Sequence, residues 1–386
     1  MLDEKNKIKI PFNKPGSTGK EIENIKDAIK QNHLSGDGLF TKKCAEWFEK
    51  NFKSKKAFLT HSCTGALEMA ALLCDIEPGD EVIMPSFTFV STANAFVLQG
   101  AIPVFVDIRP DTLNIDEGLI QAALTKKTKA IVPVHYAGVG CEMDTIKEIA
   151  QNKNIILVED AAQAILSKYN NKYLATFGEL ACISFHETKN ISSGEGGVLL
   201  INDESFIKRA EILWQKGTNR KQFLSGETDK YTWLDIGSSF LPGEMMAAYL
   251  YAQLEEAKNV NEKRLRLWNG YHEAFADLEK KGFIQRPVVP KKCIHNAHIY
   301  YIILNSFEAK QKLACYLSER GISAVSHYVP LHNSPYGLKK SRISGKMIHT
   351  NDMSERILRL PLWAELGDDI YYIIDSVNCF FKNLAT

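Results

Sequence analysis

The sequence predicts an α/β fold with a mostly parallel central sheet, followed by a smaller α+β unit. Between about residues 57 and 201, short apolar runs alternate with stretches that favour helix, which is typical of a parallel sheet covered by helices. The runs are apolar throughout, as expected for strands buried on both faces. The pattern changes near residue 281, so we expect a large domain over residues 1–280 and a small C-terminal domain over residues 281–386.

The large domain is expected to begin with an extended segment of about 20 residues, because prolines and glycines recur there. Helices are then expected over residues 20–32 and 41–52. Apolar runs predict strands over residues 57–60, 81–85, 102–107, 129–134, 155–160, 181–185 and 198–201. Helix-favouring stretches predict helices over residues 64–74, 88–99 and 143–152, and one that ends near residue 214.

A long helical region is expected to link the two domains. Residues 243–281 favour helix almost continuously and contain no proline. Beyond them, the small domain is expected to contain strands over residues 297–304 and 322–328, a helix over residues 307–320, and two terminal helical stretches.

The composition is that of an ordinary globular protein, with 45% hydrophobic and 24% charged residues. The net charge of +1 gives no reason to expect nucleic acid or an anionic membrane surface as a partner. No stretch approaches 18 consecutive apolar residues, so we expect no membrane span. The eight cysteines include no C-x-x-C pair, which favours reduced thiols in a cytoplasmic protein. His295 and His298 lack a set of partner ligands, so we predict no metal site.

Lys189 follows the apolar run at residues 181–185 and precedes the glycine-rich sequence G-E-G-G at residues 194–197. A lysine placed just beyond a buried strand is held near the core and stays mobile, which suits an amine that forms a Schiff base. A solvated lysine in a hairpin loop is the alternative, since most lysines are exposed. Residues at the ends of the neighbouring strands are therefore needed to choose between a Schiff-base lysine and a solvated lysine.

The sequence H-S-C-T-G at residues 61–65 lies between a predicted strand and a predicted helix. Backbone amides at a helix N-terminus bind phosphate, and Thr64 and Gly65 would allow a close approach. A simple helix cap is an equally good interpretation. Neither a P-loop nor G-x-G-x-x-G is present, which argues against a nicotinamide enzyme.

Three further strand ends carry polar or aromatic residues. Asp160 closes a very apolar strand, where its carboxylate needs a cationic or hydrogen-bonding partner, although it could also cap the following helix. Phe87 and Phe89 follow another strand, and one could stack on a flat ring while at least one belongs to the core. Ser184, five residues before Lys189, could add a donor to a bound phosphate.

A phosphate seat, an acid for a ring nitrogen, a stacking aromatic and a Schiff-base lysine together describe a site for pyridoxal 5′-phosphate. This cofactor acts as an electron sink, while the protein supplies the lysine and the acidic partner of the ring nitrogen. Each signal is weak alone, and their joint occurrence at strand ends is what carries the prediction, because ligands of open α/β sheets bind at the carboxyl ends of the strands.

Several motifs resemble those of the DegT/DnrJ/EryC/StrS family of sugar-nucleotide aminotransferases. They are V-E-D-A-A-Q at residues 158–163, S-F-H-E-T-K-N at residues 184–190, and G-E-G-G. Longer segments, among them Y-T-W-L-D-I-G-S-S and H-Y-V-P-L-H, are similar to one branch of the family, which makes dTDP-4-amino-4,6-dideoxy-D-galactose for enterobacterial common antigen. The resemblance runs from Pro11 to the C-terminus and implies fold type I of pyridoxal enzymes, the fold of aspartate aminotransferase.

The resemblance implies a role for individual residues. Lys189 would be the Schiff-base lysine and proton shuttle, and Asp160 the acid that keeps the ring nitrogen protonated. Gln163 would lie beside the ring hydroxyl. The remaining cofactor contacts implied are Phe89 as the stacking aromatic, Thr64 and Gly65 as the backbone phosphate seat, and Ser184 as its side-chain donor.

The same resemblance implies the substrates. L-glutamate would give its amino group to dTDP-4-keto-6-deoxy-D-glucose, which leaves 2-oxoglutarate. Tyr328 and His332 would help to bind the sugar nucleotide, with loop packing as the alternative. Lys216 and Asn219, in the loop at residues 216–220, are further candidates for substrate contacts, and that loop is a candidate for contacts across a homodimer with active sites at the subunit interface.

One departure from the family pattern concerns the segment S-S-F-L-P-G-E at residues 238–244. Many relatives place an asparagine there, which reaches the phosphate in the neighbouring subunit, and Ser238 or Ser239 could replace it. Two alternatives stay open, namely an aminotransferase for another nucleotide-linked keto sugar and a non-catalytic pyridoxal-binding regulator. A sugar dehydratase is disfavoured, because such relatives carry histidine where Lys189 stands.

Overall fold

A computed structural model, which describes residues 9–384, contains an eight-stranded sheet at its centre. Its order is β1 (Lys56–Thr60), β9 (Gly197–Ile201), β8 (Leu180–Ser184), β5 (Ile156–Asp160), β4 (Thr128–Ile131), β2 (Glu81–Pro85), β3 (Ile102–Val106) and β13 (Arg342–Ile343). All pairings from β8 to β13 are parallel, and β9 is antiparallel to both β8 and β1. The predicted α/β class with a mostly parallel sheet is confirmed.

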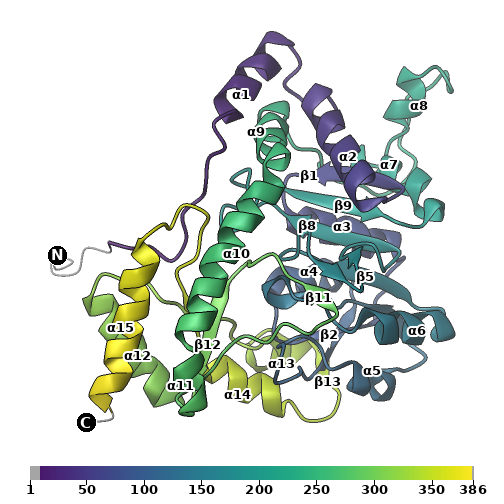
Figure 1. Cartoon of the computed structure of the whole chain (residues 1–386). Coiled ribbons are helices and arrows are strands. Elements are labelled where there is room, and N and C mark those ends of the chain that lie inside the picture. The colour runs from purple at the N-terminus through teal and green to yellow at the C-terminus, as the bar shows by residue number, and fades with distance from the viewer. Residues whose placement is uncertain (1–8, 385–386) are drawn as a thin grey trace, which may run out of the picture.

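Helices cover both faces of this sheet (Figure 1). One face packs against α2 (Leu39–Phe52), α5 (Glu117–Ala123), α6 (Met143–Lys153) and α9 (Glu244–Glu255). The other face packs against α3 (Cys63–Leu73), α4 (Val90–Val97) and α7 (Ile207–Trp214). In β2, Ile83 joins the first core, and its neighbours Val82 and Met84 join the second. This alternation explains why the strands are apolar at every position.

The long helical region that the sequence predicts is present as three consecutive helices. They are α9, α10 (Ala257–Ala274) and α11 (Ala276–Lys280), separated only by Glu256 and Phe275. They run from the large sheet to the smaller sheet (Figure 1). At the other end of the chain, α1 (Glu21–Lys30) packs against α9.

The C-terminal part contains a three-stranded sheet of β10 (Ile284–Gln285), β12 (Tyr300–Leu304) and β14 (Ile357–Leu360). It shares a hydrophobic core with α10, α12 (Phe307–Glu319) and α15 (Asp369–Leu384), and α14 (Ile348–Arg356) leads into β14. The strand predicted over residues 322–328 is wrong. This segment forms only two isolated bridges, from Ile322 to Ile10 and from Val325 to Arg359. No strand pairs with it over several consecutive residues, so it does not become a strand.

The division at residue 281 stays a prediction, and several pairings cross it. β13 extends the large sheet beside β3, and β11 (Cys293–Ile294) pairs with β6 (Lys168–Tyr169), which pairs with β7 (Lys172–Tyr173). The C-terminal part is therefore tied to the large sheet through β13 and to a separate small sheet of β11, β6 and β7, besides the connection through α10.

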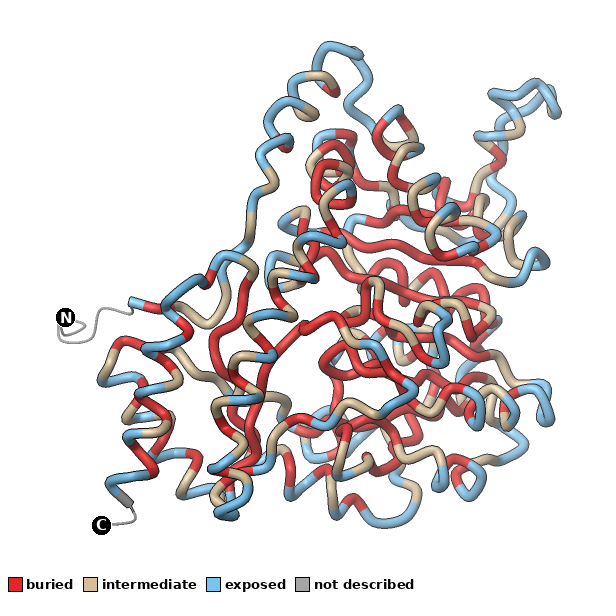
Figure 2. Tube along the Cα trace, viewed as in Figure 1, coloured by how far each residue is buried: buried red, intermediate tan, exposed pale blue. Residues whose placement is uncertain are grey.

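Residues 216–242, which we call the arm, project beyond the sheet and include α8 (Arg220–Leu224) (Figure 1). Most of the arm is exposed, whereas the central strands of the sheet are largely buried (Figure 2). At its base, the Gly217 carbonyl accepts a hydrogen bond from the Leu234 amide at 2.7 Å. A side chain at Gly217 would collide with the Asp235 carbonyl, so the base requires glycine there. No helix within residues 9–384 has the length and apolar character of a membrane span.

Candidate active site

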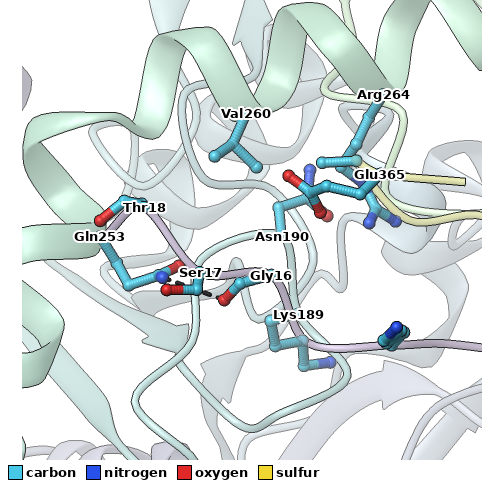
Figure 3. A pocket seen from close by; sticks show the side chains of 11 residues that line it. Gly16, Ser17, Thr18, Lys189, Asn190, Gln253, Val260, Arg264 and Glu365 are labelled. Atoms are coloured by element: carbon cyan, nitrogen blue, oxygen red, sulfur yellow. Dashed lines mark hydrogen bonds between the residues drawn. The ribbon is translucent and has the colours of Figure 1, made fainter. Parts of the chain in front are cut away.

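Lys189 lies in the loop between β8 and β9, partly buried, with its amide donating to the His186 carbonyl at 2.9 Å. The side chains of Lys189 and Asn190 point in opposite directions from this loop (Figure 3). The cavity behind them, bordered by residues 16–18 and α10, has about 10 Å³ of space, which is room for about one water molecule. This cavity is too small for a cofactor, so a cofactor that reaches the Lys189 amine would have to bind elsewhere beside the loop.

Asn190 fixes the loop to distant parts of the chain. Its Nδ2 donates at 2.8 Å both to Asn261 Oδ1 on α10 and to the Asn296 carbonyl, and its Oδ1 lies 3.0 Å from His298 Nδ1. All four residues are buried. Since these buried hydrogen bonds connect the loop to α10 and to residues 296–298, they hold the backbone of Lys189 in one place. The sequence pattern contained no signal for this network, because its members come from three separate segments.

Asp160 ends β5, and its side chain is 4% exposed. Its carboxylate accepts hydrogen bonds from Thr92 Oγ1 at 2.7 Å and from the Ala162 amide at 3.1 Å. Asp160 takes part in none of the ion pairs formed within residues 9–384. A buried carboxylate with two hydrogen bonds and no cation fits a protonated ring nitrogen as its missing partner. Thr92 is a candidate site residue that the sequence reasoning missed, although it lies only three residues beyond Phe89.

Asp160 lies close enough to Lys189 and Cys63 to influence the pKa of both. Burial raises the pKa of the Cys63 thiol well above its usual range, and the negative charge of Asp160 adds to that rise. Burial lowers the pKa of Lys189, while Cys63 and Asp160 oppose the change. The structure therefore brings together the predicted lysine and the predicted acid.

The lowered pKa of Lys189 makes its amine more reactive than that of an ordinary lysine near neutral pH, since only the unprotonated amine attacks an aldehyde. In cofactor-free enzyme, we expect acetylation of Lys189 to rise with pH around a midpoint below 10.5, the ordinary value for lysine. Peptide mass spectrometry after brief labelling over a pH series measures this midpoint. The same peptide from denatured enzyme is the control, and equal midpoints would contradict the effect of burial.

The predicted phosphate seat forms the start of α3. Ser62 caps this helix, and its Oγ accepts from the Gly65 amide at 3.1 Å, so that amide is already engaged. The first-turn amides of Cys63 and Thr64 have no acceptor within the helix and are available to an anion. The Thr64 hydroxyl lies 2.7 Å from Ser91 Oγ. The seat therefore combines free amides with hydroxyl groups from α3 and α4.

Ser184 lies at the same edge of the sheet. It is the last residue of β8 and pairs with Gly197 of β9, which pairs in turn with Thr60, just before α3. Ser184 is buried, and its Oγ accepts from the His186 amide at 3.4 Å, a long bond. Its hydroxyl proton therefore remains free for an anion bound at the start of α3.

Gly197 explains part of the G-E-G-G motif. A Cβ atom there would lie 2.5 Å from the Cys63 amide nitrogen and 2.5 Å from the Ser62 carbonyl carbon, too close for any side chain. We expect Gly197→Ala to displace the start of α3, to destabilise folding by about 1–3 kcal/mol and to weaken cofactor binding at least about tenfold. Fluorescence titration of apoenzyme with the cofactor measures the affinity.

Gly194→Ala provides the matched control for Gly197→Ala. Gly194 has a φ of +80° with open space around its Cα, so alanine should cost about 1 kcal/mol of folding free energy without moving α3. An equal loss of cofactor affinity in both variants would contradict the role given to Gly197.

Phe89 and Phe87 differ in their exposure. Phe89, just before α4, is 57% exposed, with its ring centre 6.4 Å from that of Tyr328. Phe87 is buried against Tyr136 and Tyr328, which confirms that one of the pair belongs to the core. The exposed face of Phe89 leaves it available for stacking on a flat ring.

Gln163 and Tyr328 meet although they are distant in sequence. Gln163 Nε2 donates to the Tyr328 hydroxyl at 3.1 Å, and its Oε1 accepts from the Ala137 amide at 2.7 Å. Tyr328, predicted as a substrate contact, is thus placed beside a predicted cofactor contact. Burial raises the pKa of Tyr328 above its usual range, so its hydroxyl stays protonated and can donate.

His332, Lys216 and Asn219 are placed differently. The His332 ring is buried, with Nδ1 2.7 Å from Ser86 Oγ, so this nitrogen is already engaged. Asn219 is also engaged, since its side chain bonds the backbone of Thr232 and Lys230 across the arm. Lys216 is exposed and lines an open hollow of about 500 Å³ that shares no lining residue with the cavity beside Lys189. Contacts of these three with substrate remain predictions.

Together these residues fit pyridoxal phosphate. Lys189 would hold it covalently, Asp160 would pair with its ring nitrogen, Phe89 would stack on the ring, and the start of α3 with Ser184 would bind the phosphate.

Comparison with known proteins decides the family. The sequence model of the DegT/DnrJ/EryC1/StrS aminotransferase family matches residues 16–378. The chain belongs to this family. It is 31% identical to a GDP-perosamine synthase of Escherichia coli O157:H7 over 379 residues, which covers 97% of this chain and 99% of that protein.

Solved structures of other aminotransferases have the same fold. An aminotransferase, TlmJ, from Streptoalloteichus hindustanus superposes with a TM-score of 0.89 at 25% identity, covering 98% of this chain and all of that one. A sugar aminotransferase, Spr1654, from Streptococcus pneumoniae in its pyridoxal phosphate form superposes with a TM-score of 0.87 at 25% identity, covering 95% and 97% of the two chains. This protein is therefore a sugar aminotransferase that uses pyridoxal 5′-phosphate, as the sequence predicted.

Proposed function

We propose that this aminotransferase moves the amino group of L-glutamate to C4 of dTDP-4-keto-6-deoxy-D-glucose. The products are 2-oxoglutarate and dTDP-4-amino-4,6-dideoxy-D-galactose. The observation that carries the amino-transfer chemistry is the proximity of the Lys189 amine and the unpaired Asp160 carboxylate in a buried site. The choice of sugar rests on the extended sequence similarity to the branch of the family that makes this product.

The protein groups divide the chemistry among themselves. The bound cofactor supplies an electron sink, which makes the proton on the donor's α-carbon acidic. Lys189, whose pKa is lowered by burial, takes that proton as a general base and returns it as a general acid. Thr92 and the Ala162 amide hold the Asp160 carboxylate in position. The Asn190 network holds the loop that carries Lys189, so the amine can move while its backbone stays fixed.

The exposed surface around the site supports a homodimer. Phe89, Val90, Leu39 and Met245 are exposed large apolar side chains on the large domain. The arm adds Phe223, Leu224, Tyr231, Trp233, Leu234 and Ile236. Extended apolar surface of this kind marks a protein interface, and a second copy of the chain would cover it. In such a dimer, Lys216 and Ser239, which line the same hollow, would reach the partner's site, where Ser239 would replace the family asparagine.

Trp233 is 80% exposed on the arm, and we expect it to anchor this interface. Trp233→Asp should weaken dimerisation at least about 30-fold, because it places a charge in an apolar contact. Sedimentation equilibrium measures the dissociation constant. Tyr371→Asp, at an exposed aromatic on α15, is the matched control. Equal dimer stability in both variants would argue against the arm as the interface.

The sugar specificity is tested by a substrate panel. With L-glutamate as donor, we expect kcat/KM for dTDP-4-keto-6-deoxy-D-glucose to exceed that for a GDP-linked 4-keto-6-deoxy sugar at least about 100-fold. The GDP-linked sugar is the appropriate competitor, because a GDP-perosamine synthase is among the relatives. A preference for the GDP-linked sugar would overturn the substrate proposal and leave the aminotransferase assignment intact. We place the reaction in the cytoplasm, where all eight cysteines would stay free thiols.

A further inference from the structure

Arg359 is a partly buried cation that the chemistry described so far does not use. It lies in β14, in register with Tyr301 of β12. Its neighbours Leu358 and Leu360 belong to the core of the C-terminal unit. Ile357, on the same face of the strand as Arg359, packs in the cluster that contains Phe87, Tyr136 and Tyr328. The side chain of Arg359 is therefore on the face that borders the active-site aromatics.

The guanidinium of Arg359 has few partners. It lies over the Phe12 ring, 4.4 Å from the ring centre, and one terminal nitrogen donates to the Ser326 carbonyl at 3.1 Å. Its Nε is buried without a hydrogen-bond partner. No ion pair within residues 9–384 includes it. A guanidinium carries five N–H donors, so most of its capacity is unused.

The positive charge of Arg359 reaches Lys189. It contributes to lowering the pKa of Lys189, and also the pKa values of His298 and His327, in each case after the larger effect of burial. The groups that oppose the lowering of its own pKa are the phenols of Tyr136 and Tyr328, which carry no charge at neutral pH. Leaving a cation partly desolvated without an anion is costly, and such a site is suited to an anionic ligand.

We propose that Arg359 binds the α-carboxylate of the amino-acid donor, an inference that rests on the proposed function. The donor's α-carboxylate is bonded to the carbon at which Lys189 takes its proton, so it must lie within one bond of the reacting atom. The sugar nucleotide's diphosphate is attached at C1, on the opposite side of the sugar ring from the reacting C4. Because Arg359 is near enough to Lys189 to lower its pKa, it is better placed to bind the donor's carboxylate than the diphosphate. Its planar fork can form two parallel hydrogen bonds to a carboxylate.

The test separates the two half-reactions in single-turnover experiments on the cofactor-loaded enzyme. Arg359→Met should lower kcat/KM for L-glutamate about 30-fold or more, because a charge-assisted hydrogen bond is lost. The reverse half-reaction with the amino sugar should change less than about threefold. Calorimetry with glutarate, a dicarboxylate without an amine, should give a similar loss of affinity. Arg359→Lys, which keeps the charge and loses the fork, should recover part of both.

Arg320→Met is the matched control. Arg320 also lies over an aromatic ring, that of Tyr316 at 3.4 Å, and also donates to one carbonyl at 3.2 Å, but it caps α12 in the C-terminal unit. It should leave both half-reactions and glutarate binding unchanged. If Arg359→Met does not fold, as judged by its melting curve, Arg359→Lys replaces it in the two half-reactions and in the glutarate titration.

Two results would overturn the proposal for Arg359. In the first, a folded Arg359 variant keeps its constants for L-glutamate and glutarate within about threefold of wild type. In the second, the amino-sugar half-reaction is impaired while the glutamate half-reaction is intact, which would assign Arg359 to the diphosphate. Failure of the proposed function is distinguishable, because wild-type enzyme would then aminate no keto sugar while glutarate binding would still report on Arg359.

Discussion

Replacing Lys189 with alanine should reduce amino transfer at least about 10⁴-fold, the largest effect expected for any single substitution in this chain. The variant loses both the amine that links the cofactor to the protein and the general base that moves the proton. Burial gives this amine its lowered pKa, so exogenous amines in solution are poor substitutes. Borohydride reduction followed by peptide mass spectrometry provides a second measurement, because it should fix the cofactor to Lys189 in wild type and to no residue in the variant.

Lys168→Ala is the control for this prediction, since Lys168 is also partly buried, with its amine over the Tyr173 ring at 4.7 Å. It should retain both activity and the borohydride adduct on Lys189. An adduct on a different lysine in wild type, or substantial turnover by Lys189→Ala, would show that another residue carries the chemistry.

Asp160→Asn should reduce amino transfer about 10³-fold. The substitution keeps the size of the side chain and removes the negative charge that would balance a protonated ring nitrogen. Breaking a buried ion pair by neutralising one partner costs about 3–5 kcal/mol, and every 1.36 kcal/mol is a factor of ten in rate. Steady-state kinetics together with the pH dependence of the bound cofactor's absorbance measure the effect, because loss of the ring-nitrogen proton changes the spectrum.

Thr92→Val separates charge from orientation. It removes the hydroxyl that donates to Asp160 at 2.7 Å and keeps the carboxylate charged. We expect a loss of about tenfold, in line with one neutral donor to a charged acceptor. If Asp160→Asn cost no more than Thr92→Val, the charge of Asp160 would not be what the cofactor needs.

The sequence was sufficient for features that depend on local pattern. Apolar runs identified every strand of the large sheet except the two-residue edge strand β13, since strands covered on both faces need no polar alternation. Asp160 and Lys189 were identifiable because a polar residue at the end of a buried strand is conspicuous, and parallel strands gather such ends at one edge. The separation of Phe87 from Phe89 needed only the expectation that one aromatic belongs to the core.

Features that depend on contacts between distant segments were not predictable. Thr92, Asn190 and Arg359 gain their roles from partners 68, 71 and 33 positions away or more, through packing that no local pattern encodes. The strand expected over residues 322–328 failed for the same reason, because an apolar stretch becomes a strand only where a partner runs beside it. His332 was predicted as a substrate contact from its motif alone, whereas in the structure its ring nitrogen is hydrogen-bonded to the Ser86 hydroxyl.

The most direct test of the central claim follows the nitrogen atom itself. Purified enzyme is incubated with L-glutamate labelled with ¹⁵N at its amino group and with dTDP-4-keto-6-deoxy-D-glucose, and the sugar nucleotide is then analysed by mass spectrometry and NMR. We predict stoichiometric formation of 2-oxoglutarate and a dTDP-linked amino sugar that carries ¹⁵N at C4. An unaltered keto sugar, despite a cofactor bound to Lys189, would contradict the account.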